Sequence, residues 1–387
     1  HQLILFAVPL VTTPYISRVL LADGLGSYDF SQSISLYFVM IANLGFGYYA
    51  QREIACCKDD TQKRSQIFFE ILISKILFTI IALIGFSILI ISKLFADYNS
   101  LLLILMITTL SSAFDVSFLF KGVEKFEIVS LCQSTIKIVS VICIFVFVKD
   151  GEDIPIYALI MNLYSLVSCL VMIPFCKKYI SFKSVSRPKI KEHIKSSFIL
   201  FLPTIFGFFY TSFLKTQIGL LIKGEIIYEK NNQMVLVSLS DIQNGYFGQA
   251  DKLIQMGLAI VTALGAVMAS RNAYLIKKND FTGFKKNITN TAKFTLLMTI
   301  PISFGIIAIS SNLVPWFFGD GFKEITNLLK FYPILIVISG LGNVFGLQSL
   351  VSQGKFKKFT LGTLAGAIIS ISVSFFLIKE FMAIGAA

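Results

Sequence analysis

The sequence predicts an all-α polytopic membrane protein built from two six-helix bundles. Hydrophobic residues make up 55% of the 387 residues and charged residues only 14%. This leaves too little polar material to cover a water-soluble protein of that size. The apolar residues fall in unbroken runs of about 20, the length that a helix needs to cross a bilayer. Similar features recur six runs apart, which predicts the two bundles.

Eleven apolar runs bounded by charged residues predict membrane-spanning helices. They cover residues 1–16, 31–50, 67–91, 100–120, 128–148, 154–175, 197–220, 245–268, 291–312, 328–350 and 359–378. Between the seventh and eighth, residues 225–240 alternate apolar and polar side chains, which predicts a small hairpin outside the membrane or else an irregular loop. The first run already contains His1 and a twelfth begins at Ala383, so we expect a chain truncated at both ends.

The distribution of lysine and arginine predicts how these spans are oriented. Of the 34 basic residues, 21 lie in connections that follow even-numbered spans, and only seven in those that follow odd-numbered spans. Because cytoplasmic connections retain positive charge, the even-numbered connections and the N-terminus are expected in the cytoplasm. The net charge of +12 is therefore a signal of topology. Scattered over five short loops, it does not indicate nucleic-acid binding.

An internal repeat divides the chain into two halves. Matching features recur in the same order, namely Gly26 and Gly245 before an apolar helix, Leu44-Gly45 before Arg52 and Leu264-Gly265 before Arg271, and Lys125-Phe126 and Lys358-Phe359 at later spans. Since six spans separate the copies, the repeat is parallel, about a pseudo-two-fold axis along the membrane normal. We expect an N-terminal lobe at 1–175, a basic cytoplasmic linker at 176–196 and a C-terminal lobe at 197–387.

The sequence gives no sign of catalysis, a cofactor or a metal. It lacks a G-x-x-x-x-G-K phosphate loop, so direct use of ATP by the usual route is excluded. Its two histidines are His1 and His193, the latter in the basic linker, and no outward connection gathers carboxylates or nucleophiles. Its six cysteines have no metal-ligand spacing. We therefore expect no enzymatic activity, no cofactor and no metal site.

Charged residues inside the spans or at their ends form the candidate site. A charge near mid-bilayer costs about 2.5–3.5 kcal/mol and tends to face a cavity. Six cations are expected to line one route between the lobes and to bind an anionic substrate: Arg18, Arg52, Lys137, Lys215, Lys252 and Arg271. Their side chains would replace the water that a pyrophosphate loses on entering the protein. Lys137 lies about 14 Å into the fifth span, at about 1.5 Å per residue.

These candidates also have structural alternatives. Lys137 could pair with Asp115 of the fourth span, which would neutralise both groups and hold two helices together. Asp115 is otherwise a candidate for ion coupling, and it is the single acid that we count against Lys137, Lys215 and Lys252. The arginines at span ends could simply reach the membrane interface.

A set of short motifs runs from the first span to the tenth. It begins with Pro14-Tyr15-Ile16-Ser17-Arg18-Val19-Leu20, Gly24-Leu25-Gly26-Ser27-Tyr28, Asn43-Leu44-Gly45-Phe46-Gly47 and Gln51-Arg52-Glu53-Ile54-Ala55. It continues with Gly245-Tyr246, Ala250-Asp251-Lys252, Pro315-Trp316-Phe317-Phe318-Gly319 and Asn343-Val344-Phe345-Gly346. Together these motifs resemble the Wzx-type O-antigen and polysaccharide flippases over nearly the whole chain.

This resemblance implies the polysaccharide transporter branch of the multidrug, oligosaccharidyl-lipid and polysaccharide (MOP) exporter superfamily. It implies a MATE-like fold of twelve to fourteen helices in two lobes, located in the bacterial cytoplasmic (inner) membrane. It also implies alternating access to undecaprenyl-pyrophosphate-linked oligosaccharides such as O-antigen or capsule repeat units. Where the family usually has Asp-Lys late in the seventh span, this chain has Leu214-Lys215, which puts ion coupling at that place in doubt.

Three functions compete for this sequence. The first is the flippase, whose partners would be the lipid-linked oligosaccharide, anionic membrane lipids and the polysaccharide polymerase and chain-length machinery, without nucleic acid. The alternative from the same superfamily is a cation-coupled multidrug exporter, which should carry carboxylates in its spans. A membrane-bound polymerase or glycosyltransferase would need a large extramembrane loop, which the outward connections do not provide.

Overall fold

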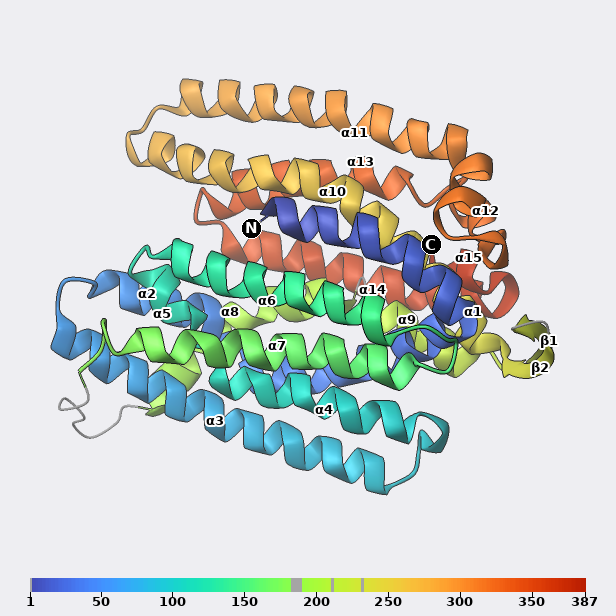
Figure 1. Ribbon diagram of the computed structural model, residues 1–387. Helices are drawn as coiled ribbons and strands as arrows, with labels where there is room; N and C mark the ends of the chain where they lie inside the picture. The colour runs from blue at the N-terminus through green and yellow to red at the C-terminus, as the bar shows by residue number, and fades with distance from the viewer. Residues whose placement is uncertain (1, 182–189, 210–211, 231–232) are drawn as a thin grey trace. The chain divides into compact units, whose positions relative to one another are not determined.

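The computed structural model describes residues 2–181, 190–209, 212–230 and 233–387 (Figure 1). Helices account for most of this described part, and its sheet is a two-stranded hairpin. Among the described residues, seven helical segments are long and apolar enough to cross a membrane. The prediction of an all-α polytopic membrane protein is confirmed.

Two compact units can be distinguished by their internal packing. One comprises Ser27–Phe208, and the other comprises Gln2–Gly26 together with Phe209–Ala387. The first helical stretch of the chain therefore packs with the C-terminal part of the sequence. The predicted lobes at 1–175 and 197–387 were defined by the sequence repeat, whereas these units are defined by packing. The division into lobes therefore stays a prediction.

The first unit consists of helices around a core rich in phenylalanine. Its elements are the second part of α1 (Gln2–Asn43), α2 (Phe46–Cys56), α3 (Thr61–Ile91), the 3-10 helix η1 (Ala96–Tyr98), α4 (Asn99–Phe114), α5 (Ser117–Gly122), α6 (Phe126–Phe147), α7 (Ile154–Cys176) and nearly all of α8 (Ile190–Phe209). Helix α4 packs against both α3 and α7, and α6 packs against α7 (Figure 1). Helix α2 packs on α5, where Phe46, Phe118 and Phe120 are fully buried.

The second unit is arranged around one long helix, α10. Its other elements are the first part of α1, α9 (Ser212–Leu221), β1 (Glu225–Lys230), β2 (Gln233–Ser238), α11 (Phe281–Phe317), the 3-10 helix η2 (Asp320–Phe322), α12 (Ile325–Leu328), α13 (Ile334–Asn343), the π-helical η3 (Val344–Val351), α14 (Phe356–Phe381) and α15 (Ala383–Ala386). Helix α10 (Leu239–Lys277) packs against α9, α11, α13 and η3. Strands β1 and β2 pair antiparallel from Glu225 with Ser238 to Lys230 with Gln233, which confirms the predicted hairpin.

Residues 17–30, which lie between the first two predicted spans, are helical in the structure. Helix α1 passes through them with a kink at Leu21, where φ is 57° and ψ is −176°. A Cβ on Gly26 would overlap the carbonyl oxygen of Asp241, and one on Gly245 would overlap that of Ala22. The two glycines of the repeat thus let α1 and α10 approach closely. This packing overrides the loop-like composition around Gly26.

The second matched pair of glycines has two different structural causes. Gly45 has a φ of 73° and breaks the helical path between α1 and α2, and a Cβ there would crowd the backbone of Ser197. At the corresponding Gly265, α10 continues without a break to Lys277. There a Cβ would overlap the side-chain amide of Asn343. The two halves therefore share a sequence feature but not its conformation.

Candidate functional site

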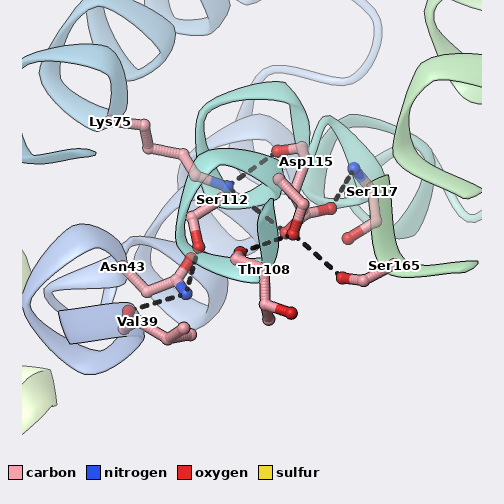
Figure 2. A network of polar contacts seen from close by, with 9 residues as sticks. Val39, Asn43, Lys75, Thr108, Ser112, Asp115, Ser117 and Ser165 are labelled. Carbon is pink, nitrogen blue, oxygen red and sulfur yellow. Dashed lines mark hydrogen bonds and ion pairs between the residues drawn. The ribbon is translucent and has the colours of Figure 1, made fainter. Parts of the chain in front are cut away.

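The helical path breaks between α4 and α5 in the first unit, and the acid Asp115 lies at this break (Figure 2). Asp115 leaves the helix with φ −72° and ψ 99°. Its carboxylate Oδ1 accepts a hydrogen bond of 3.0 Å from the backbone amide of Ser117, at the start of α5. The side chain of Asp115 thereby satisfies an amide at the start of the new helix.

Lys75 of α3 is the partner of Asp115. Its side chain is 1% exposed, and its ammonium donates to the carbonyl oxygen of Asp115 at 2.7 Å and lies 3.3 Å from carboxylate Oδ2. The ammonium also lies 5.6 Å from the ring centre of Phe118. A buried lysine in a span is tolerated when a nearby acid neutralises its charge and a carbonyl accepts its hydrogen bond. The alternative in which Asp115 pairs with Lys137 was wrong, because Lys75 holds Asp115.

Hydroxyl and amide side chains extend this polar network across neighbouring helices (Figure 2). Asn43 of α1 donates to the hydroxyl of Ser112 at 3.2 Å and to the carbonyl of Val39 at 3.0 Å. Ser111 of α4 and Ser165 of α7 share a hydrogen bond of 2.9 Å. Such bonds between helices stabilise bundles in lipid, where no water competes. The network therefore ties α1, α3, α4 and α7 together around the break.

Lys137 lies apart from this network, in the middle of α6. It is half-buried, with its ammonium 4.5 Å from the ring centre of Tyr164 and 3.9 Å from the sulfur of Met161, both on α7. An aromatic ring stabilises a cation without neutralising its charge. Lys137 thus lies inside a span beside an aromatic ring, and its role in binding an anionic substrate stays a prediction.

The other predicted cations are distributed over both units. Arg52 of the first unit is exposed and pairs with Glu53 at 2.9 Å. Arg18 of the second unit donates to the carbonyl of Pro14 at 2.8 Å and to that of Trp316. Lys215 and Lys252 are half-buried and Arg271 is exposed, all in the second unit. Their common role as the lining of one route stays a prediction.

Sequence reasoning missed a buried cluster of Glu70, His193 and Tyr49. His193 Nε2 lies 2.7 Å from the carboxylate of Glu70, and its Nδ1 lies 2.8 Å from the hydroxyl of Tyr49. All three residues are less than 9% exposed. They join α3, α8 and α2, and His193, within the predicted basic linker, lies in helix α8. The available signal was a lone acid near the start of an apolar run, at Glu70.

The count of acids in the spans was too low. Besides Asp115, the structure buries Asp23 and Asp29 in α1, Glu70 in α3 and Asp251 in α10. Asp251 accepts a hydrogen bond of 3.0 Å from the Tyr332 hydroxyl. Carboxylates are therefore not scarce inside the described helices, and their number does not disfavour a cation-coupled exporter.

Comparisons with known proteins identify the family. The family model described as "Polysaccharide biosynthesis protein" matches residues 1–268. The chain belongs to this polysaccharide biosynthesis protein family. A relative from Escherichia coli (strain K12), named "Putative O-antigen transporter", is 24% identical over 99% of this chain and 88% of its own length. A protein of the same name from Shigella dysenteriae is 22% identical over 98% of this chain and 91% of its own length.

Solved structures place this polysaccharide biosynthesis family member in a known fold. A MOP superfamily transporter from Pyrococcus furiosus matches 99% of this chain and 88% of its own with a TM-score of 0.62 at 14% identity. A MATE in complex with MaD3S matches 100% of this chain and 90% of its own with a TM-score of 0.63, also at 14% identity. At such identities the likeness concerns the fold. The resemblance drawn from the motifs to the polysaccharide branch of this superfamily is confirmed.

Proposed function

We propose that this chain is a flippase that moves an undecaprenyl-pyrophosphate-linked oligosaccharide across the bacterial inner membrane. Membership of the polysaccharide biosynthesis family supports this proposal, as does the similarity to two relatives named for O-antigen transport. The proposal also includes a cytoplasmic N-terminus and alternating access. Polysaccharide polymerase and chain-length machinery are its proposed protein partners, and anionic lipids meet its basic connections.

The observation that supports the proposal is the position of Lys137 inside a span. Its ammonium contacts an aromatic ring and a thioether, both on the neighbouring helix α7. A pyrophosphate head group that leaves water needs such cations along its path. The head group would cross past Lys137, while the polyprenyl chain stays on the lipid-facing side of the protein.

A cation-coupled exporter is the second candidate function. The buried carboxylates Glu70 and Asp251 favour it, because acids in a membrane attract cations and exchange them for ions. The fold that the chain shares with MATE structures is compatible with either function.

Transport in proteoliposomes distinguishes the two candidates. The purified chain is reconstituted and presented in parallel with a fluorescent polyprenyl-pyrophosphate saccharide and with a fluorescent organic cation. The flippase proposal predicts movement of the anionic lipid between leaflets and none of the cation beyond empty liposomes. Accumulation of the cation with an immobile saccharide lipid would replace the proposal with the exporter.

A further inference from the structure

An apolar groove of about 600 Å³ opens on the first unit between α3, α4 and α7. Among its sixteen described lining residues, only Thr79 and Lys177 carry a hydroxyl or a charge. Large hydrophobic side chains on its walls are exposed, including Ile76 at 41% and Ile80 at 49%. Since α3 and α7 are long and apolar enough to cross a membrane, these walls meet hydrocarbon and not water.

The groove lies on the break between α4 and α5. Phe114 and Val116, on either side of Asp115, both line it. Asp115 itself bonds to Lys75, while the next residue on α3, Ile76, lines the facing wall. The ion pair therefore fixes the local path of the backbone that shapes the groove.

One end of the groove carries positive charge and has a fixed shape. Lys177 lines this end, and Lys178 beside it is also exposed. The following segment is held by Arg64, which donates a hydrogen bond of 2.8 Å to the carbonyl of Tyr179. Ile180 is buried and lines the groove next to these bonds. The basic end is therefore formed before any ligand arrives.

The length of the groove suits an extended hydrocarbon chain. Its lining residues on α3 run from Phe68 to Leu83. At about 1.5 Å per residue this corresponds to about 22 Å along the helix axis. A bilayer core is about 30 Å thick, so the groove extends over roughly three-quarters of its thickness from the basic end inward.

We propose that this groove binds the polyprenyl chain of the lipid-linked saccharide, with its phosphate beside Lys177. This inference rests on the proposed function and adds a second contact for the same substrate. One groove with one basic end matches a lipid that has a single hydrocarbon chain below its phosphate. A glycerophospholipid has two chains, and the groove would leave one of them outside.

Photolabelling of the purified chain in phosphatidylcholine nanodiscs tests this binding. The probe is a photoactivatable polyprenyl phosphate, and mass spectrometry maps the labelled residues. Ile76→Trp fills the groove, and Ile80→Trp is a second variant that does the same. Leu77→Trp is the matched control, because Leu77 is 45% exposed at the same depth and lies outside the lining.

We expect labels to concentrate on the groove walls and to fall about tenfold in Ile76→Trp and Ile80→Trp, but not in Leu77→Trp. Equal labelling around α3, or no loss in either groove variant, would overturn the inference. Unlabelled phosphatidylglycerol that competes as well as unlabelled polyprenyl phosphate would also overturn it, by assigning the groove to a resident phospholipid.

The same preparations separate this inference from the proposed function. If the wild-type chain flips the saccharide lipid but labelling misses the groove, the groove inference fails and the flippase stands. If labelling finds the groove but no flipping occurs, the flippase proposal fails and the binding site stands.

Discussion

Lys75 donates a hydrogen bond of 2.7 Å to the main-chain carbonyl of Asp115 and lies 3.3 Å from its carboxylate. A single side chain thus satisfies a carbonyl that the α4 break releases and neutralises the acid beside it. The two residues are 40 positions apart in the chain, and their contact lies inside the apolar part of the first unit. It stabilises a polar network and an apolar groove that share the same stretch of backbone.

Replacing Lys75 with methionine should destabilise the protein by about 3 kcal/mol, because Asp115 would lose its partner in a low-dielectric environment. Thermal unfolding in detergent measures this effect. Lys63→Met is the control, since Lys63 is exposed on the same helix. The double variant with Asp115→Asn should recover part of the loss. A stability of Lys75→Met equal to that of the control would contradict the assigned pair.

Replacing Glu70 with alanine should lower stability by about 1–3 kcal/mol, because buried His193 would lose its hydrogen-bond acceptor. Tyr49→Phe removes one hydroxyl and should cost about 0.5–1.5 kcal/mol. Glu127→Ala, which removes an exposed acid on α6 away from this cluster, serves as the control. Unfolding temperatures that do not distinguish Glu70→Ala from Glu127→Ala would show that the cluster contributes nothing.

Replacing Gly245 with alanine should destabilise the second unit by about 1–3 kcal/mol or more, since the new methyl group would overlap the backbone of α1. Gly362→Ala is the matched control, because a Cβ there meets nothing within 4 Å. The yield of monodisperse protein and the unfolding temperature report the effect. Normal behaviour of Gly245→Ala would refute the close approach of α1 and α10.

Asp280 should give the start of α11 a pH-dependent stability. The Gly283 amide and the Thr282 hydroxyl donate hydrogen bonds of 2.8 and 2.9 Å that lower the pKa of Asp280. Because the pKa of Asp280 is lower in the folded state than in the unfolded state, its ionised carboxylate stabilises the fold at pH values above the unfolded-state pKa. This stabilisation is lost as the pH falls through the lowered folded-state pKa. Hydrogen exchange in the first turn of α11 should therefore differ between wild type and Asp280→Ala at neutral pH and converge in acid. A difference that persists unchanged in acid would exclude the ionised cap.

Much of this fold could be predicted from apolar runs, because the membrane requires long continuous helices. The hairpin at 225–238 also followed from local alternation. The α1 helix through Gly26 was not predictable in this way, because its cause is the contact with α10, more than two hundred residues away in the chain. The different roles of Gly45 and Gly265 were also not predictable from the sequence. Gly45 adopts a positive φ, whereas Gly265 leaves room for the side chain of Asn343.

For the candidate site, the sequence predicted how far along a span a charged residue lies, but not which neighbouring helix its side chain faces. The position of Lys137 along α6 could be read from the sequence, whereas the helix that it faces could not. Lys75 and Lys137 lie in similar apolar runs, yet one meets an acid and the other meets Tyr164. His193 and Glu70 are 123 residues apart, and only the folded chain brings them together.

The most direct test of the flippase proposal compares Lys137→Ala with wild type in proteoliposomes carrying a fluorescent polyprenyl-pyrophosphate saccharide. Lys379→Ala is the matched control, because the ammonium of Lys379 also lies over an aromatic ring, Phe375 at 4.3 Å, but at the exposed end of α14. We expect the flipping rate of Lys137→Ala to fall about tenfold or more, as the loss of a charge-assisted contact implies, while Lys379→Ala keeps the wild-type rate. Flipping by Lys137→Ala at the wild-type rate would contradict the assignment of Lys137 to the substrate path.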